Sequence, residues 1–224
     1  MELISRSIRI VNEQISLLLL SGVIGIQFYY GAFAYISVVG MLASIVIGII
    51  IYGQITIKVR GEEVLPAKEI LKRNWVNYIV VMLIIGVSTL AIIQVIKILS
   101  TSAVFLALSQ SAIKTLMSII TIYVLPIVFL KKEHMLAIVT GLVFLFQNIR
   151  KSIPLILLAG LIFIVEILLG QILVQQGQQS TNVYSLVPTL IVINIVVTYI
   201  SFLIYTAATL VLIPNSNVYV DQKA

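Results

Sequence analysis

The feature that most constrains this chain is an uncharged stretch that runs without interruption from Ile15 to Ile57. A helix needs about 20 apolar residues to cross the roughly 30 Å hydrocarbon core of a bilayer, and this stretch has about twice that number. The sequence YYGAF (Tyr29–Phe33) is a turn signal near its middle. The pattern therefore predicts two membrane-spanning helices, near residues 14–30 and 33–57.

Four further apolar segments have the length of a membrane span, near residues 77–96, 112–130, 153–173 and 188–212. The chain is 61% hydrophobic and 10% charged, whereas soluble domains are nearer half apolar and a quarter charged. We therefore expect an all-α fold, a polytopic membrane helical bundle with six transmembrane helices arranged as three hairpins. The whole chain would form a single integral membrane domain.

Basic side chains predict the orientation of these spans. All but two of the 14 Lys and Arg residues fall before the first span, between spans two and three, between spans four and five, or at the C-terminus. Only Lys97 and Lys114 lie on the other side. The positive-inside rule then places both termini in the cytoplasm, in a multi-pass protein of the cell membrane. A net charge of +6 would suggest a nucleic-acid partner in a soluble protein, but here the placement of the basic residues is more informative, and no nucleic-acid partner is expected.

Each hairpin is predicted to follow a helix on the cytoplasmic membrane surface. Before the first span, apolar side chains recur at helical steps: Ile4, Ile8, Val11 and Ile15. Before the third, Leu65–Trp75 has a proline suited to a first helical position, and Trp75 and Tyr78 would anchor at the headgroup level. Its Glu69 and Arg73 are spaced to pair. Before the fifth, Met135–Phe146 is too short to cross and apolar enough to embed.

The three units suggest an internal repeat, with possible copies at 1–57, 58–130 and 131–213. NWVNYIVVMLIIGV (Asn74–Val87) aligns without gaps with NIRKSIPLILLAGL (Asn148–Leu161), matching an Asn, an Ile and a Gly. The alternative is that any cytoplasmic helix that leads into a span tends to end in Asn or Lys. Hairpin repeats are common in membrane folds.

The segment YVLPIVFLKKEHMLAIVTGLVFLFQNIRKSIPLILLAG resembles one in poorly characterised prokaryotic six-span membrane proteins. These proteins are related to the membrane domain of some glycerophosphodiester phosphodiesterases. In that family a span ends in Pro, and a charged turn, a surface helix with Ala and a polar Asn follow; Pro126, Glu133, Ala137 and Asn148 match those points. GEEVLPAKEILKRNW resembles the matching loop between hairpins. The resemblance implies a fold and little about activity, and this chain has no room for the attached hydrolase.

Charged and polar residues inside the spans are the candidate functional residues. Ionisable groups there cost about 2.5–3.5 kcal/mol on insertion scales and usually face a bundle interior, a cavity or a partner. Glu166 interrupts GLIFIVEILLG, nine residues before Gln175, or about 13 Å inside the outer boundary at the helical rise. Lys114 would reach inward toward the same carboxyl group. Polar side chains also recur on one face of the sixth span: Asn194, Thr198, Ser201, Tyr205 and Thr209.

Two interpretations of this polar set stay open. In one, Glu166 and the polar face line a path in which Glu166 binds a proton or a cation, as in a transporter. In the other, the hydroxyls and amides hold helices together, each contact contributing less than about 2 kcal/mol. Glu166 would then be a protonated hydrogen-bond donor or a partner of Lys114.

A second feature concerns helix packing. Gly40, Ser44 and Gly48 form a ridge of small residues on the second span, which lets another helix approach closely, either within the chain or in another subunit.

Catalytic patterns are missing: the sequence has no Cys and one His, His134, so no metal site or cofactor is expected. Phosphate-binding glycine loops and the Gly-x-Ser-x-Gly elbow are missing too.

We therefore expect a protein without enzymatic activity. The first hypothesis is an accessory, scaffold or assembly subunit of a membrane complex, with membrane lipids and other membrane subunits or further copies of itself as partners. The alternative is a small transporter or permease component in which Glu166 faces a polar path.

Overall fold

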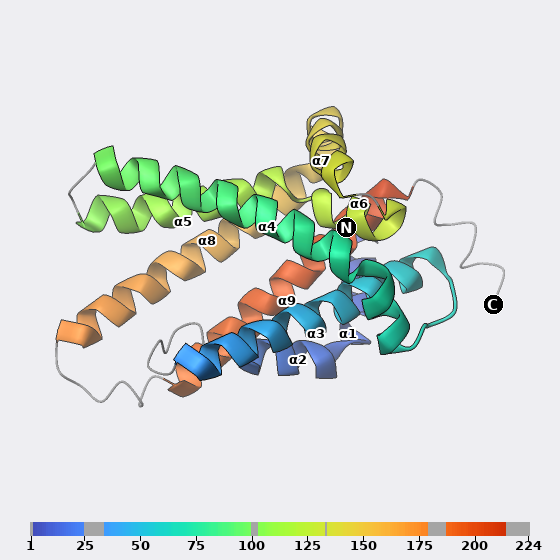
Figure 1. Ribbon diagram of the computed structural model, residues 1–224, viewed down its shortest axis with the longest axis horizontal. Coiled ribbons are helices and arrows are strands. Elements are labelled where there is room, and N and C mark those ends of the chain that lie inside the picture. Colours follow the sequence, from blue (N-terminus) through green and yellow to red (C-terminus); the bar gives the residue numbers. More distant parts are fainter. Residues whose placement is uncertain (1, 25–33, 100–102, 133, 179–186, 214–224) are drawn as a thin grey trace.

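The computed structural model describes residues 2–24, 34–99, 103–132, 134–178 and 187–213. Within these ranges every regular element is an α-helix, which confirms the predicted all-α class (Figure 1). In chain order the helices are α1 (Glu2–Asn12), α2 (Ile15–Ile24), α3 (Ala34–Arg60), α4 (Ala67–Leu99), α5 (Ala103–Ile120), α6 (Val124–Lys131), α7 (Met135–Gln147), α8 (Ile149–Gln178) and α9 (Val187–Leu212).

Several helices have the length and composition of membrane spans. Four segments qualify alone: Val39–Arg60, Ala67–Leu99, Leu108–Lys131 and Pro188–Leu212. Two pairs qualify only together, α1 with α2, bent by 78°, and α7 with the first part of α8, bent by 106°. The described chain thus has four helices that are long and apolar enough to cross a membrane, or up to six if each bent pair counts as one, and these helices indicate a membrane protein. The turn expected at Tyr29–Phe33 lies outside the described residues.

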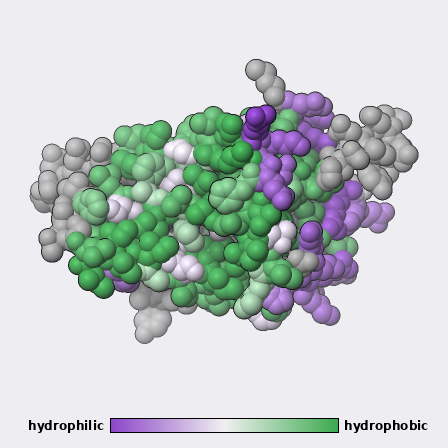
Figure 2. All heavy atoms as spheres, turned by 90° about the horizontal axis from the view of Figure 1, so that it is seen from above, coloured by the Kyte–Doolittle hydropathy of each residue, from purple (hydrophilic) through white to green (hydrophobic). Residues whose placement is uncertain are grey.

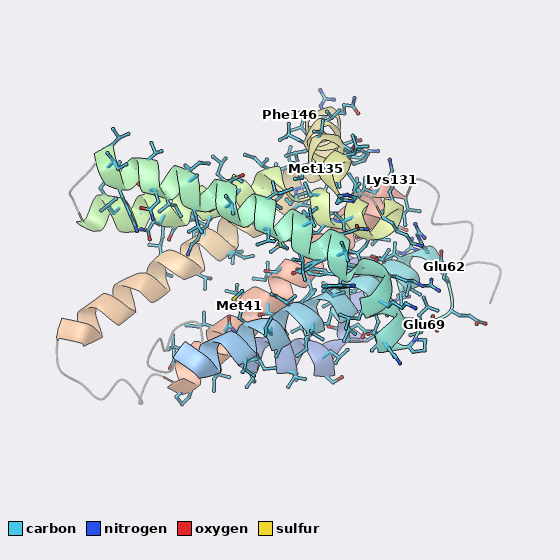
Figure 3. All side chains as sticks on the ribbon, in the orientation of Figure 1. Met41, Glu62, Glu69, Lys131, Met135 and Phe146 are labelled. Carbon is cyan, nitrogen blue, oxygen red and sulfur yellow. The ribbon has the colours of Figure 1, made fainter. Side chains whose placement is uncertain are left out.

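The sides of the bundle are apolar and exposed. In α4 only 11% of the most apolar window is buried inside the molecule, and Leu83 and Val87 are mostly exposed. Exposing apolar surface to water costs roughly 25 cal/mol per Å², so this surface favours a lipid surrounding. Figure 2 shows hydrophobic residues along the sides and hydrophilic residues gathered at one end, which we call the charged end. Figure 3 places Glu62, Glu69 and Lys131 there.

Helix α9 is the central helix of the bundle. It packs against α1, α2, α3, α6 and α8, and residues 202–210 are all buried. The contact with α2 is closest at Gly22, where an added Cβ would lie 2.9 Å from the Cα atom of Ile195. Only glycine permits this approach without a shift of one helix. The polar face of α9 is therefore held in place by neighbours on several sides.

Helix α4 differs from the expectation of a separate surface helix before the third span. Residues 67–99 form one continuous helix, whose first turns bend away from the rest in Figure 1. The backbone N–H groups of Glu69 and Ile70 donate to the Pro66 carbonyl, so Pro66 lies at the start of the helix. Proline suits this position because an N–H group there would have no partner within the helix. Glu69 and Arg73 pair at 3.5 Å, as their spacing predicts.

Helix α7 stands out from the side of the bundle near the charged end, with Met135 and Phe146 on it (Figure 3). Its junction with α8 falls at Asn148, whose side-chain amide donates to the Phe144 carbonyl. An added Cβ at Gly141 would lie 3.0 Å from the backbone nitrogen of Val124, so this glycine brings α7 against α6. The outward face is apolar and exposed: Met135, Leu136, Val139, Val143 and Phe146.

Candidate functional site

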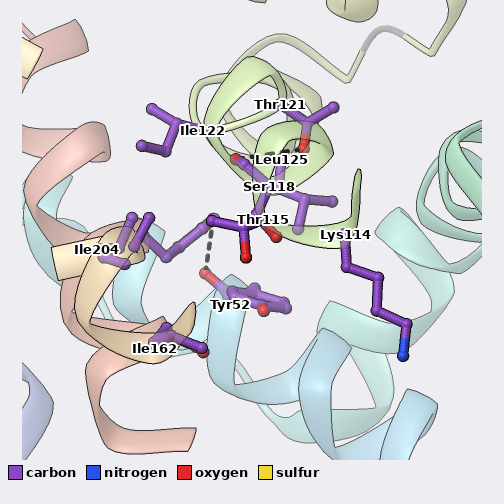
Figure 4. Close-up of a pocket in the computed structure, with 12 residues that line it drawn as sticks. Tyr52, Lys114, Thr115, Ser118, Thr121, Ile122, Leu125, Ile162 and Ile204 are labelled. Atoms are coloured by element: carbon purple, nitrogen blue, oxygen red, sulfur yellow. Dashed lines mark hydrogen bonds between the residues drawn. The ribbon is translucent and has the colours of Figure 1, made fainter. Parts of the chain in front are cut away.

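A cavity of about 230 Å³ lies where α3, α5, α6, α8 and α9 meet. Polar side chains form one part of its wall and aliphatic side chains the other (Figure 4). The residues that line it are Tyr52, Lys114, Thr115, Ser118, Thr121, Ile122, Leu125, Ala159, Ile162, Ser201, Ile204 and Tyr205. Three of the predicted intramembrane residues, Lys114, Ser201 and Tyr205, therefore meet around one space although they come from distant parts of the sequence.

Helix α5 supplies the polar wall. Thr115 and Ser118 are three residues apart, so their hydroxyls lie on one side of the helix, and Thr121 follows three residues later in the turn after α5. The Thr121 hydroxyl donates to the Met117 carbonyl. Within the described residues, the Lys114 ammonium and the hydroxyls of Thr115 and Ser118 have no hydrogen-bond or ion-pair partner. This side of α5 thus carries unused donors, the hydroxyls of Thr115 and Ser118 beside the cavity and the Lys114 ammonium at its edge.

Lys114 lies at the edge of the cavity. Figure 4 shows its side chain extending away from Thr115 and Tyr52, and the side chain is exposed. It is eleven residues beyond Ala103, the first residue of α5, a distance of about 17 Å along the helix at the helical rise. A lysine at this position requires a partner or a polar environment, since ionisable groups inside a bilayer are costly.

The span that carries Lys114 is interrupted at the cavity. Helix α5 ends at Ile120 and α6 begins at Val124, and both belong to one membrane-length segment. Pro126 explains the interruption, because it has no N–H to donate to the carbonyl of Ile122, four residues earlier. Ile122 itself lines the cavity. Interrupted helices beside binding sites are typical of membrane transporters.

Two tyrosines close the cavity on another side. The hydroxyls of Tyr205 and Thr56 are 2.6 Å apart, and the Tyr205 hydroxyl also donates to the Tyr52 carbonyl at 3.2 Å. The Thr56 hydroxyl is hydrogen-bonded to the same carbonyl at 2.8 Å. The ring centroids of Tyr52 and Tyr205 are 4.4 Å apart. These contacts fix α3 against α9.

The two tyrosines belong to a larger group of rings, which we call the aromatic cluster: Tyr52, Tyr78, Phe129, Phe202 and Tyr205. Phe129 is two residues before Lys131, at the charged end, whereas Tyr52 and Tyr205 line the cavity. The aromatic cluster therefore fills the bundle between the cavity and the charged end.

The polar face of α9 is divided between packing and the cavity. The Asn194 amide donates to the Gly22 carbonyl of α2, and the Thr209 hydroxyl donates within its own helix to Tyr205. Thr198 is half-buried and does not line the cavity. Ser201 lines the cavity while its hydroxyl donates to the Val197 carbonyl at 2.8 Å. Sequence periodicity thus predicted one polar face, but its members have different surroundings.

Glu166, the residue on which the transport hypothesis depends, lies in α8 four residues beyond Ile162. Its side chain lies outside the described part of the structure. Pairing with Lys114 therefore stays a prediction. The resemblance at Glu133 also falls on a residue outside the described ranges.

The predicted packing ridge faces α4 at one of its members. An added Cβ at Gly48 would lie 3.7 Å from the hydroxyl of Tyr78. Gly40 is buried, and among described residues the buried hydroxyl of Ser44 has no hydrogen-bond partner. The closest approach in this region is at Gly53, where an added Cβ would lie 2.2 Å from the Ile70 side chain. Sequence spacing did not single out Gly53.

The two predicted membrane anchors have different environments. Trp75 is 50% exposed, which fits a side chain at the headgroup level. Tyr78 is 7% exposed and lies 6.1 Å from the ring of Tyr52. In this structure Tyr78 is therefore a packing residue of the aromatic cluster rather than an anchor. Its position on the inner face of α4 explains the difference.

Sequence reasoning missed several cavity residues. Thr115 and Ser118 carried a usable signal, since they follow Lys114 on one helix. Tyr52 carried none, because its partner Tyr205 is 153 residues away in the sequence. Among the described residues, no three His, Cys, Asp or Glu side chains are grouped as a metal site would require.

Comparisons of the chain with protein-family models, with curated proteins and with solved structures each found no match. The resemblance to the membrane domain of glycerophosphodiester phosphodiesterases therefore stays a prediction.

Proposed function

We propose that the chain is a six-span protein of the cell membrane with both termini in the cytoplasm. Each bent helix pair would then contribute one span, and α1 and α7 would lie along the cytoplasmic surface. The segregation of hydrophilic residues to one end supports this topology, because basic residues favour the cytoplasmic side (Figure 2). Three units of three helices, α1–α3, α4–α6 and α7–α9, fit the proposed repeat.

We further propose that the protein is a non-catalytic transporter or permease component whose working site is the intramembrane cavity. One observation carries this proposal: Lys114, Ser201 and Tyr205 meet at a cavity beside an interrupted span. Glu166 would contribute the proton- or cation-binding carboxylate, one helical turn beyond the cavity residue Ile162.

A direct test uses the purified chain in vesicles that carry a pH-sensitive dye and a membrane potential. The wild-type protein is expected to conduct a proton- or cation-coupled flux, and Glu166→Gln is expected to abolish it. Glu69→Gln is the matched control, since Glu69 is an exposed residue paired with Arg73 at 3.5 Å. Unchanged flux in Glu166→Gln would remove this mechanism.

An accessory or assembly subunit is the second candidate. Its support is that several polar side chains inside the bundle are hydrogen-bonded within the chain, as Asn194 is to Gly22 and Tyr205 is to Thr56. Such a rigid protein is expected to co-purify with a fixed membrane subunit, or with further copies of itself, after mild detergent extraction. Repeated isolation of the bare monomer would count against it.

A further inference from the structure

We propose that the cavity binds the anionic group of an amphiphile, a phosphate or carboxylate attached to an apolar chain, and that Lys114 is its charge partner. This inference rests on the proposed function of the cavity and names the ligand class. It follows from the charge of the lining residues, from their unused hydrogen-bond donors and from the shape of the apolar wall.

The described part of the cavity wall is positively charged. Among its twelve described lining residues, Lys114 carries the only charge, and no Asp or Glu belongs to this described set. Within the described residues its ammonium has no ion-pair partner. An unpaired charge below the membrane surface is unfavourable, so a bound anion would stabilise Lys114 in this position.

The donors of the polar wall match an oxyanion. A lysine ammonium has three N–H donors and no acceptor, and each hydroxyl of Thr115 and Ser118 offers one more donor. Among described residues these hydroxyls are not hydrogen-bonded, unlike that of Ser201, which donates to Val197. Charge-assisted hydrogen bonds to carboxylate or phosphate are the strong ones, so an anion bound beside Thr115 and Ser118 would draw the flexible Lys114 side chain toward it from the edge of the cavity.

The remaining wall of the cavity is apolar and favours an apolar chain next to the anionic group. Aliphatic side chains from three helices and the turn before α6 face the same space: Ile122, Leu125, Ala159, Ile162 and Ile204. The volume of about 230 Å³ is below the roughly 300–1,000 Å³ of sites for drug-sized ligands. The cavity therefore accommodates a headgroup or a short chain segment, while the rest of the amphiphile stays in the bilayer.

The experiment measures binding to the purified full chain in neutral detergent. The probes are phosphatidylglycerol and oleate, which carry a phosphodiester and a carboxylate, with phosphatidylcholine and inorganic phosphate as comparison ligands. Wild-type protein is expected to bind both anionic amphiphiles at least tenfold more tightly than either comparison ligand. Equal binding of phosphatidylcholine, or tight binding of inorganic phosphate alone, would overturn the ligand class.

Variants assign the binding to Lys114. Lys114→Gln is expected to weaken binding of both anionic amphiphiles at least tenfold, Ser118→Ala several-fold, and Lys114→Arg little, because it keeps the charge. Lys97→Gln is the matched control, since Lys97 is the other lysine outside the charged end and does not line the cavity. Equal losses for Lys97→Gln and Lys114→Gln, or no loss for Lys114→Gln, would overturn the assignment.

Glu166→Gln separates this proposal from an internal ion pair. If Glu166 already formed an ion pair with Lys114, removing its carboxylate would free the ammonium and strongly tighten anion binding, and that result would overturn the proposal. Unchanged or modestly altered binding supports it. Failure of binding with intact coupled flux would refute the ligand class alone, whereas intact binding with flux unaffected by Glu166→Gln would refute the transport mechanism alone.

Discussion

At the scale of residues, polar side chains within the bundle differ in whether they have partners. Tyr205 is fully engaged, since its hydroxyl contacts both the Thr56 hydroxyl and the Tyr52 carbonyl. The buried Ser44 hydroxyl has no partner among the described residues. A buried hydrogen bond contributes about 0.5–1.5 kcal/mol net, whereas an unpaired buried polar group contributes nothing favourable.

Tyr205→Phe is therefore expected to lower the free energy of unfolding by about 1–2 kcal/mol, because it removes two hydrogen bonds and keeps the ring. Ser44→Ala is its matched control and is expected to leave stability unchanged or slightly raised. Denaturant titration in detergent, followed by circular dichroism, measures both. A larger loss for Ser44→Ala than for Tyr205→Phe would contradict the hydrogen-bond pattern.

Residue types in the spans predicted the polar site in part. Lys114, Ser201 and Tyr205 were singled out because polar groups are costly inside a membrane and usually face a cavity or a partner. All three line the cavity. Partners were not predictable, because Asn194 and Gly22 are 172 residues apart and helical periodicity says nothing about the facing helix. For the same reason, the sequence did not predict that Tyr78 packs against Tyr52.

At the scale of elements, glycines decide how closely helices approach. An added Cβ would lie 2.7 Å from the Ile195 side chain at Gly22 and 2.9 Å from the Val124 side chain at Gly141. At Gly160 nothing described lies within 4 Å of an added Cβ. Small residues drive helix packing in membranes, where burying apolar surface supplies little association energy.

Gly22→Ala and Gly141→Ala are expected to destabilise the bundle by roughly 1–3 kcal/mol, because the new methyl group overpacks the contact. Gly160→Ala is expected to be neutral or stabilising by up to about 1 kcal/mol, since alanine favours a helix interior. Thermal unfolding in one detergent compares the three. Equal effects at Gly22 and Gly160 would contradict the close contact of α2 with α9.

Helix α7 makes a second prediction at this scale, and the single tryptophan of the chain provides the reporter. In wild-type protein, Trp75 fluorescence is expected to be quenched best by lipids brominated near the headgroup, because Trp75 is half exposed near the start of α4. In Trp75→Phe with Phe146→Trp, the same shallow quenching is expected if α7 lies along the surface. Strongest quenching by lipids brominated near the chain ends would contradict that orientation of α7.

Hydrophobic periodicity predicted the elements better than their breaks. The predicted spans near 77–96 and 188–212 fall within α4 and α9. The interruption between α5 and α6 was not predicted, although Pro126 carried the signal, because a proline near a span end is common and its effect depends on neighbouring contacts. Conversely, the predicted surface helix before the third span is continuous with α4.

At the scale of the whole molecule, apolar sides and one charged end define how the bundle sits in a bilayer (Figure 2). Salt bridges near that end are exposed, such as Lys58 with Glu13 at 2.6 Å and Arg60 with Glu62 at 3.3 Å. Exposed pairs contribute little stability, typically below about 1 kcal/mol. The charged end therefore matters chiefly for orientation, which the distribution of Lys and Arg already predicts from the sequence.

Cysteine labelling in cells tests the central claim most directly, because the chain has no native cysteine. We expect a membrane-impermeant thiol reagent to label Ser180→Cys, in the polar segment between the last two spans, on intact cells. Lys68→Cys, at the charged end, should react only after the membrane is opened, and Ser201→Cys, half-buried in the cavity, should be protected from both sides relative to these two. Labelling of Lys68→Cys on intact cells would contradict the proposed orientation, and free labelling of Ser201→Cys from the cytoplasmic side would contradict a cavity closed there by the aromatic cluster.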